Sequence, residues 1–351
     1  MPKSAMIGVA TATTETAYTQ SDILTLFNIT DLKTRSLFLK SGIGKRYLTL
    51  PPANKAGTLD IENQTQLLQK HQIIGTQIGS QALITCLNNV SATLKDVKFL
   101  CCVTTTGFLS PGLSAHIIDE TSLDANITRL DVAGMGCNAG LNALNVVSSW
   151  AQTHPNELAV LLCVEVCSAA YLNDNSMRTA VVNSLFGDGA AALAVKSYQD
   201  KTQLSASIIK FTSLLIPNTL PAMRYDWNEE HHKFSFFIDR DIPYIIGANA
   251  EKIVDELLNN TPYTRKDVTH WIVHSGGKKV IDAIRINLAL SRHDLRHTTS
   301  VLNDYGNLSS GSFLFSYERL LAEGNINVGD IGIMMTMGPG STIEAALIKW
   351  I

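Results

Sequence analysis

Short apolar segments alternate with longer amphipathic segments along almost all of the 351 residues, and this alternation constrains the fold more than any other feature. Apolar runs of strand length in the first part of the chain lie at 6–10, 97–104, 128–132, 158–167 and 190–196, and helical patterns lie at 19–27, 63–87, 111–123 and 141–154. Continuous apolar runs, as opposed to alternating ones, indicate strands covered by helices on both faces. The sequence therefore predicts an α/β fold with a largely buried sheet.

The same order of elements recurs in the second part of the chain. Strand-like runs lie at 205–214, 271–274, 331–337 and 343–348, and helical patterns lie at 244–259, 278–290 and 308–323. Each part contains a polar residue that opens a helix between glycines: Cys137 in GMGCNAG (134–140) and Asn307 in GNLSSG (306–311). No linker rich in proline, glycine or serine separates the two parts. We therefore predict a duplicated unit with halves 1–204 and 205–351, and a polar excursion or lid at 218–233.

Charge and cysteine content exclude several classes of protein. Lys and Arg number 28 against 31 Asp and Glu, and 45% of residues are hydrophobic, which excludes a disordered chain and gives no footprint for nucleic acid or an anionic membrane. The apolar run 158–164 is too short to span a bilayer. Six cysteines without a CxxC pair favour neither a disulfide framework nor structural zinc. The sequence predicts a cytoplasmic protein without a metal site.

Cys137 differs from the other five cysteines, which lie in apolar runs and are interpreted as small core residues. Its glycine-rich surroundings permit a sharp turn that presents the side chain at a helix N-terminus. The helix dipole and free N–H groups there favour a thiolate, so Cys137 is the candidate nucleophile. Glu165 lies within an apolar strand and is interpreted as a structural carboxylate that backbone donors satisfy.

His274 and Asn307 are the candidate partners of Cys137. His274 leaves the strand 271–273 into a Ser-Gly-Gly turn, and this position faces the usual crevice of an α/β sheet; a hydrogen-bonded structural histidine is the alternative. Asn307 offers an amide donor at a helix start, where plain N-capping is the alternative. Together the three suit acyl transfer through a thioester with a stabilised oxyanion. They equally suit a papain-like hydrolase, and their spacing does not separate the two.

Five motifs, taken in order, resemble those of the thiolase-fold condensing enzymes, and among these the type III polyketide synthases. They are GCNAG (136–140), LFGDGAAA (185–192), HSGG (274–277), YGNLSS (305–310) and GPGSTIE (338–344). The last motif points to the polyketide branch and away from the ketoacyl synthases of fatty-acid synthesis. The resemblance implies a thiolase-like fold, built as a duplicated αβαβα layered unit with two mixed sheets, and a homodimer.

The resemblance also implies roles for individual residues. Cys137 would carry the growing chain, and His274 and Asn307 would hold the malonyl thioester carbonyl and stabilise the enolate formed by decarboxylation. Phe186 and Phe236 match the aromatic gate between the CoA tunnel and the cavity; two ordinary core aromatics are the alternative. Gly338 falls in the loop that the family places at the oxyanion and the cavity.

Three lysines match the family's CoA contacts. Lys33 and Lys40 fall on lysines that bind the CoA phosphates, and Lys279 would place its backbone beside the pantetheine arm. The family's intervening arginine is Ser36 here, with Arg35 next to it.

Further runs at 132–145, 274–282 and 296–299 resemble the bacterial subgroup that forms 3,5-dihydroxyphenylacetyl-CoA. This implies condensation of four malonyl-CoA units, without a metal or organic cofactor, with helper enzymes for dehydration or hydrolysis among the partners. A type III synthase with another acyl-CoA starter, making a pyrone or a resorcinol, is the alternative. A non-catalytic thiolase-fold subunit is a further alternative, against which the intact Cys, His and Asn argue.

Overall fold

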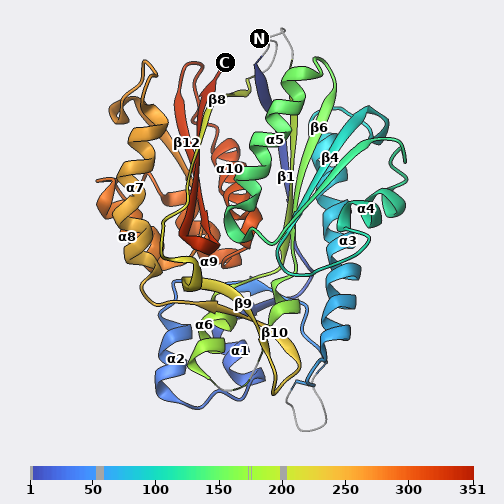
Figure 1. Ribbon diagram of the computed structural model, residues 1–351, viewed down its shortest axis with the longest axis vertical. Helices are drawn as coiled ribbons and strands as arrows, with labels where there is room; N and C mark the ends of the chain where they lie inside the picture. The colour runs from blue at the N-terminus through green and yellow to red at the C-terminus, as the bar shows by residue number, and fades with distance from the viewer. Residues whose placement is uncertain (1–2, 53–58, 173, 175, 198–203) are drawn as a thin grey trace.

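Helices and sheet form five layers in the computed structural model, which describes residues 3–52, 59–172, 174, 176–197 and 204–351. In Figure 1, α5 and α10 lie in the middle, α3 and α4 cover one outer side, and α7 and α8 cover the other. The bounds of these helices are α3 Gln64–Asn89, α4 Leu113–Thr121, α5 Ala139–Thr153, α7 Ile242–Leu258, α8 Lys278–Asn287 and α10 Ser312–Glu323. The predicted α/β class is confirmed.

One mixed sheet of nine strands runs through the described residues, in the order β11-β12-β13-β8-β1-β7-β6-β4-β5. Its strands are β1 Ser4–Ala12, β4 Val97–Thr104, β5 Thr128–Ala133, β6 Leu158–Glu165, β7 Gly189–Ser197, β8 Ala206–Leu214, β11 Val268–Val273, β12 Ile331–Gly338 and β13 Thr342–Trp350. The expectation of two separate sheets is wrong on this point. Ala5 and Met6 of β1 pair with Ser207 and Ala206 of β8, and this short ladder joins the two parts of the sheet.

The core explains why the central strands are apolar along their whole length. Every residue of β6 is buried, because α3 packs on one part of the sheet from outside and α5 packs on it from the middle layer. A sheet covered on both faces needs no polar alternation, so the predicted run 97–104 coincides with β4. The fully buried Glu165 at the end of β6 is the exception, and it lies beside the candidate site.

Local sequence signals set several helix ends. Thr19 caps α1 (Gln20–Leu26): the Asp22 carboxylate accepts from the Thr19 N–H at 2.8 Å, and the Thr19 hydroxyl accepts from the Asp22 N–H at 3.2 Å. The helix predicted at 308–323 begins later, at Ser312, because residues Ser309–Gly311 form a tighter 3₁₀ turn in which Ser309 has φ 48°. This turn takes Asn307 and Ser309 out of the helix and into the site.

A smaller layer closes the end of the molecule opposite the two termini (Figure 1). It contains α1, α2 (Leu32–Leu39), α6 (Met177–Leu185), the strands β2 (Ala17–Thr19) and β3 (Lys45–Tyr47), and the hairpin of β9 (Met223–Asn228) and β10 (Lys233–Ile238). The hairpin accounts for the predicted excursion at 218–233. The sequence reading lacked α2, α6, β10 and the helix α9 (Arg296–Tyr305).

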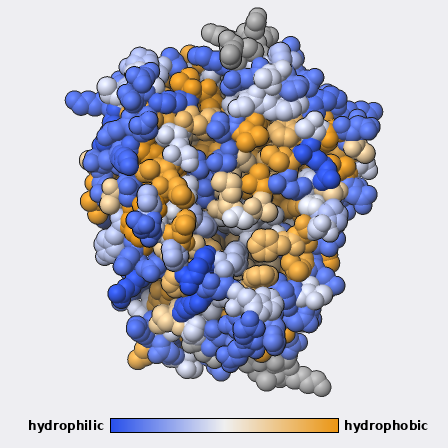
Figure 2. All heavy atoms as spheres, viewed as in Figure 1, coloured by the Kyte–Doolittle hydropathy of each residue, from blue (hydrophilic) through white to orange (hydrophobic). Residues whose placement is uncertain are grey.

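The surface differs along the length of the molecule. Figure 2 shows hydrophobic side chains gathered on both sides of the middle of this face, whereas its lower end is mostly hydrophilic. Among the described residues, no helix combines the length and the apolar character that a membrane crossing requires.

Candidate active site

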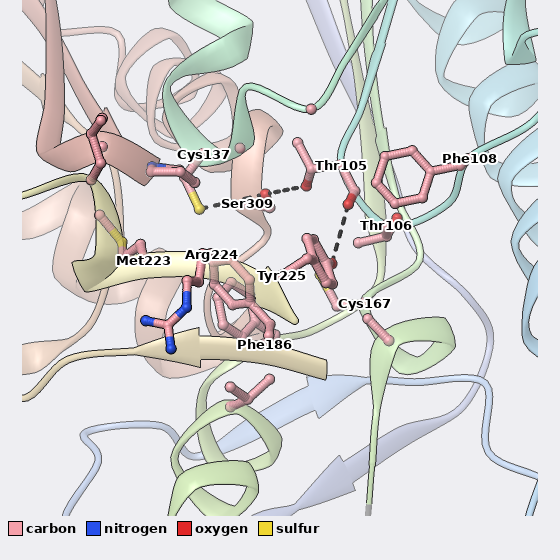
Figure 3. Close-up of a pocket in the computed structure, with 18 residues that line it drawn as sticks. Thr105, Thr106, Phe108, Cys137, Cys167, Phe186, Met223, Arg224, Tyr225 and Ser309 are labelled. Atoms are coloured by element: carbon pink, nitrogen blue, oxygen red, sulfur yellow. Dashed lines mark hydrogen bonds between the residues drawn. The ribbon is translucent and has the colours of Figure 1, made fainter. Parts of the chain in front are cut away.

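A cavity of about 380 Å³ opens where the sheet, α6 and the β9–β10 hairpin meet (Figure 3). Its walls are mainly apolar. The lining residues are Thr105, Thr106, Phe108, Gly134, Gly136, Cys137, Cys167, Ala170, Val182, Phe186, Leu220, Met223, Arg224, Tyr225, Phe236, Ser309, Pro339 and Gly340. The cavity is of the size that small-molecule sites commonly have, and Cys137 is part of its wall.

Cys137 lies on a 3₁₀ turn, Gly136–Asn138, that leads directly into α5. The turn packs against the loop that follows β12, and glycines make this close approach possible. A Cβ on Gly136, whose φ is +81°, would lie 2.1 Å from the Pro339 ring. A Cβ on Gly338 would lie 2.1 Å from the Asn138 side chain. Gly338 thus packs against the turn Gly136–Asn138, which we call the nucleophile turn, while its neighbours Pro339 and Gly340 line the cavity.

The environment of Cys137 favours the thiol, in contrast to the thiolate that the helix N-terminus led us to expect. Burial raises the pKa of Cys137 to about 12, and hydrogen bonds from Ser309 and Asn307 oppose this rise only in part. The side chain is 6% exposed, so little water remains to solvate a charge on sulfur. Burial therefore favours the neutral thiol over the thiolate.

A chain of hydrogen bonds leads from the sulfur to a buried carboxylate. The Ser309 hydroxyl lies 3.5 Å from Cys137 Sγ and 2.9 Å from the Thr105 hydroxyl, as Figure 3 shows. The Thr105 hydroxyl in turn lies 3.0 Å from Glu165 Oε2. The Ser309 hydroxyl thus lies between the sulfur and the Thr105 hydroxyl.

Glu165 has the backbone donors that the sequence reading expected, and hydroxyl donors in addition. It accepts from the backbone N–H groups of Thr105 at 3.0 Å and Ser310 at 3.3 Å, and from both of their hydroxyls. Burial raises the pKa of Glu165, and these hydrogen bonds counter the rise. The carboxylate ties the end of β4 to the turn that precedes α10.

His274 follows β11 and is almost fully buried. Its backbone N–H donates to the Met335 carbonyl at 2.8 Å, and this hydrogen bond extends the β11–β12 pairing into the site. Burial lowers the pKa of His274 to about 3, so the ring is neutral at pH 7. A neutral imidazole still carries one N–H donor, which suits a substrate carbonyl oxygen that gains negative charge.

Asn307 is held by its backbone and by its side-chain oxygen. Its N–H donates to the Leu185 carbonyl at 2.8 Å, and its carbonyl accepts from the Gly187 N–H at 3.0 Å. Its Oδ1 accepts from the Ser309 N–H at 2.8 Å, which fixes the amide plane. The amide nitrogen lies 3.4 Å from the Gly276 carbonyl, and Asn307 also lowers the pKa of Cys137. The amide donor therefore lies between the nucleophile turn and the loop that follows His274.

The structure brings some predicted site residues to the cavity surface and leaves others behind it. Phe186 and Phe236 both line the cavity, and their rings meet edge to face with centroids 5.9 Å apart. His274 and Asn307 are buried and do not line it.

The predicted CoA lysines lie elsewhere. Lys33 and Lys40 are exposed on and after α2, and Lys279 is exposed on α8. Arg35 is engaged locally, because its guanidinium donates to the Ile29 carbonyl at 3.1 Å. Nothing in the geometry tests the CoA contact, which stays a prediction.

Sequence reasoning missed three residues of the site: Thr105, Ser309 and Tyr225. The polar run Thr-Thr-Thr at 104–106, at the end of an apolar strand, was a usable signal for the first. Ser309 follows the candidate Asn307 by two residues. Tyr225 gave no signal; it reaches the site because the hairpin folds over the cavity, where its hydroxyl donates to the Thr105 carbonyl at 3.2 Å.

Comparison with known proteins gives the family. Residues 7–213 match the family model described as FAE1/Type III polyketide synthase-like protein, and residues 208–351 match chalcone and stilbene synthases, C-terminal domain. A 3,5-dihydroxyphenylacetyl-CoA synthase of Amycolatopsis orientalis is 58% identical over 98% of this chain and 92% of its own. A 3,5-dihydroxyphenylacetyl-CoA synthase of Streptomyces toyocaensis is 55% identical over 99% of this chain and 90% of its own.

Solved structures agree on the fold. The 1,3,6,8-tetrahydroxynaphthalene synthase of Streptomyces coelicolor A3(2) superposes with a TM-score of 0.89 at 25% identity, covering 99% of both chains. The structure of PKS-I from the brown alga Ectocarpus siliculosus superposes with a TM-score of 0.92 at 23% identity, covering 100% of this chain and 99% of the other. The expected thiolase-like architecture is confirmed at this level.

Proposed function

Because the chain belongs to the type III polyketide synthase family, we propose that it condenses four malonyl-CoA units into 3,5-dihydroxyphenylacetyl-CoA. The observation that carries the proposal is identity of 55–58% over nearly the full length of relatives that bear this synthase name. The cavity beside Cys137 supports it, because the reaction needs an enclosed, apolar chamber next to a nucleophile.

Loading begins on Cys137. One malonyl unit loses CO₂ to give an acetyl group, and the Cys137 sulfur attacks the acetyl thioester and displaces CoA. The thiol proton must leave as the carbon–sulfur bond forms, since the thiolate is the competent nucleophile. The departing CoA thiolate takes up this proton, and the Ser309 hydroxyl, 3.5 Å from the sulfur, is placed to relay it.

His274 and Asn307 stabilise the enolate. Loss of CO₂ from a malonyl thioester leaves an electron pair that spreads onto the thioester oxygen. Two preorganised N–H donors in a water-poor site stabilise that oxyanion, and the imidazole needs no positive charge to donate. The low pKa of His274 supports this role, because the ring keeps the same protonation state throughout the working pH range.

Chain growth then repeats three times. The enolate carbon attacks the Cys137 thioester, releases the sulfur, and gives a chain two carbons longer on CoA; transfer back to Cys137 frees that CoA. The eight-carbon chain closes when its methyl carbon attacks the C3 carbonyl, and loss of water makes the ring aromatic. In total, four malonyl-CoA give one product thioester, three CoA, four CO₂ and one water.

The remaining assignments are part of the same proposal. Phe186 and Phe236 gate the passage between CoA and the cavity, and their edge-to-face contact supports a pair that moves together. Lys33, Lys40 and Lys279 contact CoA. Residues 1–204 and 205–351 are the two copies of a duplicated unit, which the equivalent central positions of α5 and α10 support (Figure 1).

The active form is a homodimer. β5 lies at the edge of the sheet, and most of its residues are exposed, including the apolar Leu130. An exposed edge strand with apolar side chains favours pairing with another chain, and a second copy of this chain offers a matching edge. Light scattering on the Leu130→Lys variant tests this: it should shift mass toward the monomer, and an unchanged dimer would reject pairing at this edge.

The decisive experiment is incubation of the purified protein with malonyl-CoA alone, followed by mass spectrometry before and after mild alkaline hydrolysis. The expected result is the CoA ester of dihydroxyphenylacetic acid, which hydrolysis converts to the free acid. Pyrones, or CO₂ without ring product, would reject this product and direct attention to other acyl starters. Absence of any CO₂ release would reject malonyl-CoA as the starter.

A further inference from the structure

Arg46 is a fully buried cation that the proposed chemistry does not use. It lies on β3, and its side chain has no exposed surface. The acceptors around it are all neutral: the two N–H groups of Nη1 are shared among the Tyr171 hydroxyl and the Asn183 and Phe186 carbonyls, each 2.7 Å from Nη1, and Nη2 donates at 2.8 Å to Gln20 Oε1. Burial of a guanidinium is unfavourable, so these bonds must offset the loss of its hydration.

Two of the acceptors belong to the segment that carries the aromatic gate. Asn183 and Phe186 lie at the end of α6 and directly after it, where the chain turns toward β7. The Tyr171 hydroxyl joins the same cluster, since it accepts from Arg46 and donates to the Phe186 carbonyl. The guanidinium therefore holds the Phe186 carbonyl directly and through the Tyr171 hydroxyl, and it holds the preceding helix end at the Asn183 carbonyl. The ring of Phe186, on the same residue, lines the cavity.

The turn fixed by Arg46 also fixes Asn307. Leu185 and Gly187, on either side of Phe186, exchange backbone hydrogen bonds with Asn307 at 2.8 and 3.0 Å. Arg46 touches this bridge directly: a Cβ on Gly306 would lie 2.6 Å from the Leu185 carbonyl oxygen and 2.8 Å from Arg46 Cδ. The arginine, the turn and the asparagine loop thus form one closely packed unit, with a glycine at the point of closest approach.

We propose that Arg46 is a positioning residue which, through the turn at 185–187, sets both the Phe186 ring at the cavity and the Asn307 amide beside Cys137. Arg46 touches no substrate; it acts through the residues it holds. This assignment rests on the proposed function, since it presumes that Asn307 and Phe186 act in decarboxylation and in retention of the chain. Loss of Arg46 should impair both steps together, whereas loss of either residue alone should impair one.

Two variants test the proposal at different strengths. Arg46→Lys keeps the charge, but a single ammonium cannot reach acceptors in the directions that the planar fork serves. Tyr171→Phe removes only the hydroxyl that links Arg46 to the Phe186 carbonyl, and leaves the packing of the ring. Tyr317→Phe is the matched control, because Tyr317 is a similarly buried tyrosine on α10 without a described hydrogen bond to this turn.

Malonyl-CoA decarboxylation and ring product are measured per active site, with Cys137 titrated by iodoacetamide. We expect kcat to fall on the order of 10²-fold in Arg46→Lys and about tenfold in Tyr171→Phe, with KM changed less and with less ring product per CO₂. Tyr317→Phe should match the wild type in all three. A role confined to stability would lower the yield of folded protein but leave kcat per titrated site and product per CO₂ unchanged, and that result would overturn the proposal.

A second readout does not depend on the substrate. Asn307 lowers the pKa of Cys137, so a displaced amide should move the pH profile of Cys137 alkylation upward in both test variants. Failure of the wild type to decarboxylate malonyl-CoA would defeat the proposed function, yet the alkylation profiles would still decide on Arg46. Profiles identical to that of the wild type would reject it.

Discussion

The two glycine-flanked turns that open α5 and α10 resemble each other in sequence but differ in their surroundings. Cys137 lines the cavity, whereas Asn307 is buried and bridged to residues 185–187, and its turn reaches the cavity wall only through Ser309. The two turns also touch, because Gly140 lies against the Ser310 carbonyl. The difference teaches that a local motif can present a side chain at a helix start, and that the elements packed around it decide whether that side chain lines the cavity wall or is buried and held by neighbouring segments.

Removal of the Cys137 sulfur should have the largest effect on activity. Cys137→Ala should lower ring-product formation by on the order of 10⁴-fold or more, because the sulfur that holds the acyl chain as a thioester is gone. Some decarboxylation of malonyl-CoA should remain, since the donors at the other turn stay in place. Radiolabelled CO₂ release and product mass spectrometry measure the two, with Cys101→Ala in the core as control. Product at the wild-type level would contradict the role of Cys137.

Removal of one of the hydrogen-bond donors to the enolate, Asn307 or His274, should slow decarboxylation itself. Asn307→Ala and His274→Ala should each lower its kcat by roughly 10²–10³-fold, the usual loss for one oxyanion donor. Steady-state CO₂ release checks this, with the exposed Asn303→Ala on α9 as the control. If either variant keeps its decarboxylation rate and loses only elongation, the division of labour between the turns is wrong.

The contact between the turns predicts a difference between two glycines. A Cβ on Gly140 would lie 2.3 Å from the Ser310 carbonyl oxygen, whereas one on Gly311 would meet only side-chain carbons at 3.5 Å and beyond. Gly140→Ala should lower the free energy of unfolding by about 1–3 kcal/mol, although alanine in a helix normally stabilises. Gly311→Ala should change it by less than about 1 kcal/mol. Urea denaturation compares them, and equal stability would show that the turns can separate at little cost.

The smallest expected effect concerns the protonation state of the Cys137 sulfur. Since the pKa of Cys137 is raised to about 12, the thiolate fraction and the rate of iodoacetamide alkylation should rise about tenfold per pH unit between pH 7 and 10. Ser309 lowers this pKa, so Ser309→Ala should slow alkylation by a few-fold at pH 8. A plateau below pH 9 in the wild type would mean that the helix terminus outweighs burial after all.

The part of the fold that could be predicted is the part in which local pattern and tertiary environment agree. The run 97–104 coincides with β4 because a strand covered on both faces shows a continuous apolar run. The helix predicted at 19–27 begins where its capping box, Thr19 and Asp22, lies, and this signal depends on residue type and spacing alone. The joining of the sheet between β1 and β8 could not be read, because it depends on only two residue pairs far apart in the sequence.

The features of the candidate site likewise divide into those that local sequence predicts and those that depend on tertiary packing. Cys137 stands out because its glycine-rich surroundings are visible in the chain, and the chemistry of Asn307 and His274 is legible from residue type. Burial acts against the expected thiolate by raising the pKa of Cys137, and the degree of burial depends on how many elements pack over the sulfur. Thr105, Ser309 and Glu165 form a chain toward Cys137 only when the ends of β4 and β6 meet the turn before α10.

The sequence by itself determined the alternation of elements, the two turns and the chemical nature of the groups they carry, because these depend on neighbours within a few residues. Only the tertiary structure decided which groups face the cavity, the protonation of the cysteine and the histidine, and the embedding of Arg46 behind the gate. Those properties arise from desolvation and hydrogen bonds between segments more than a hundred residues apart, and no local pattern encodes either.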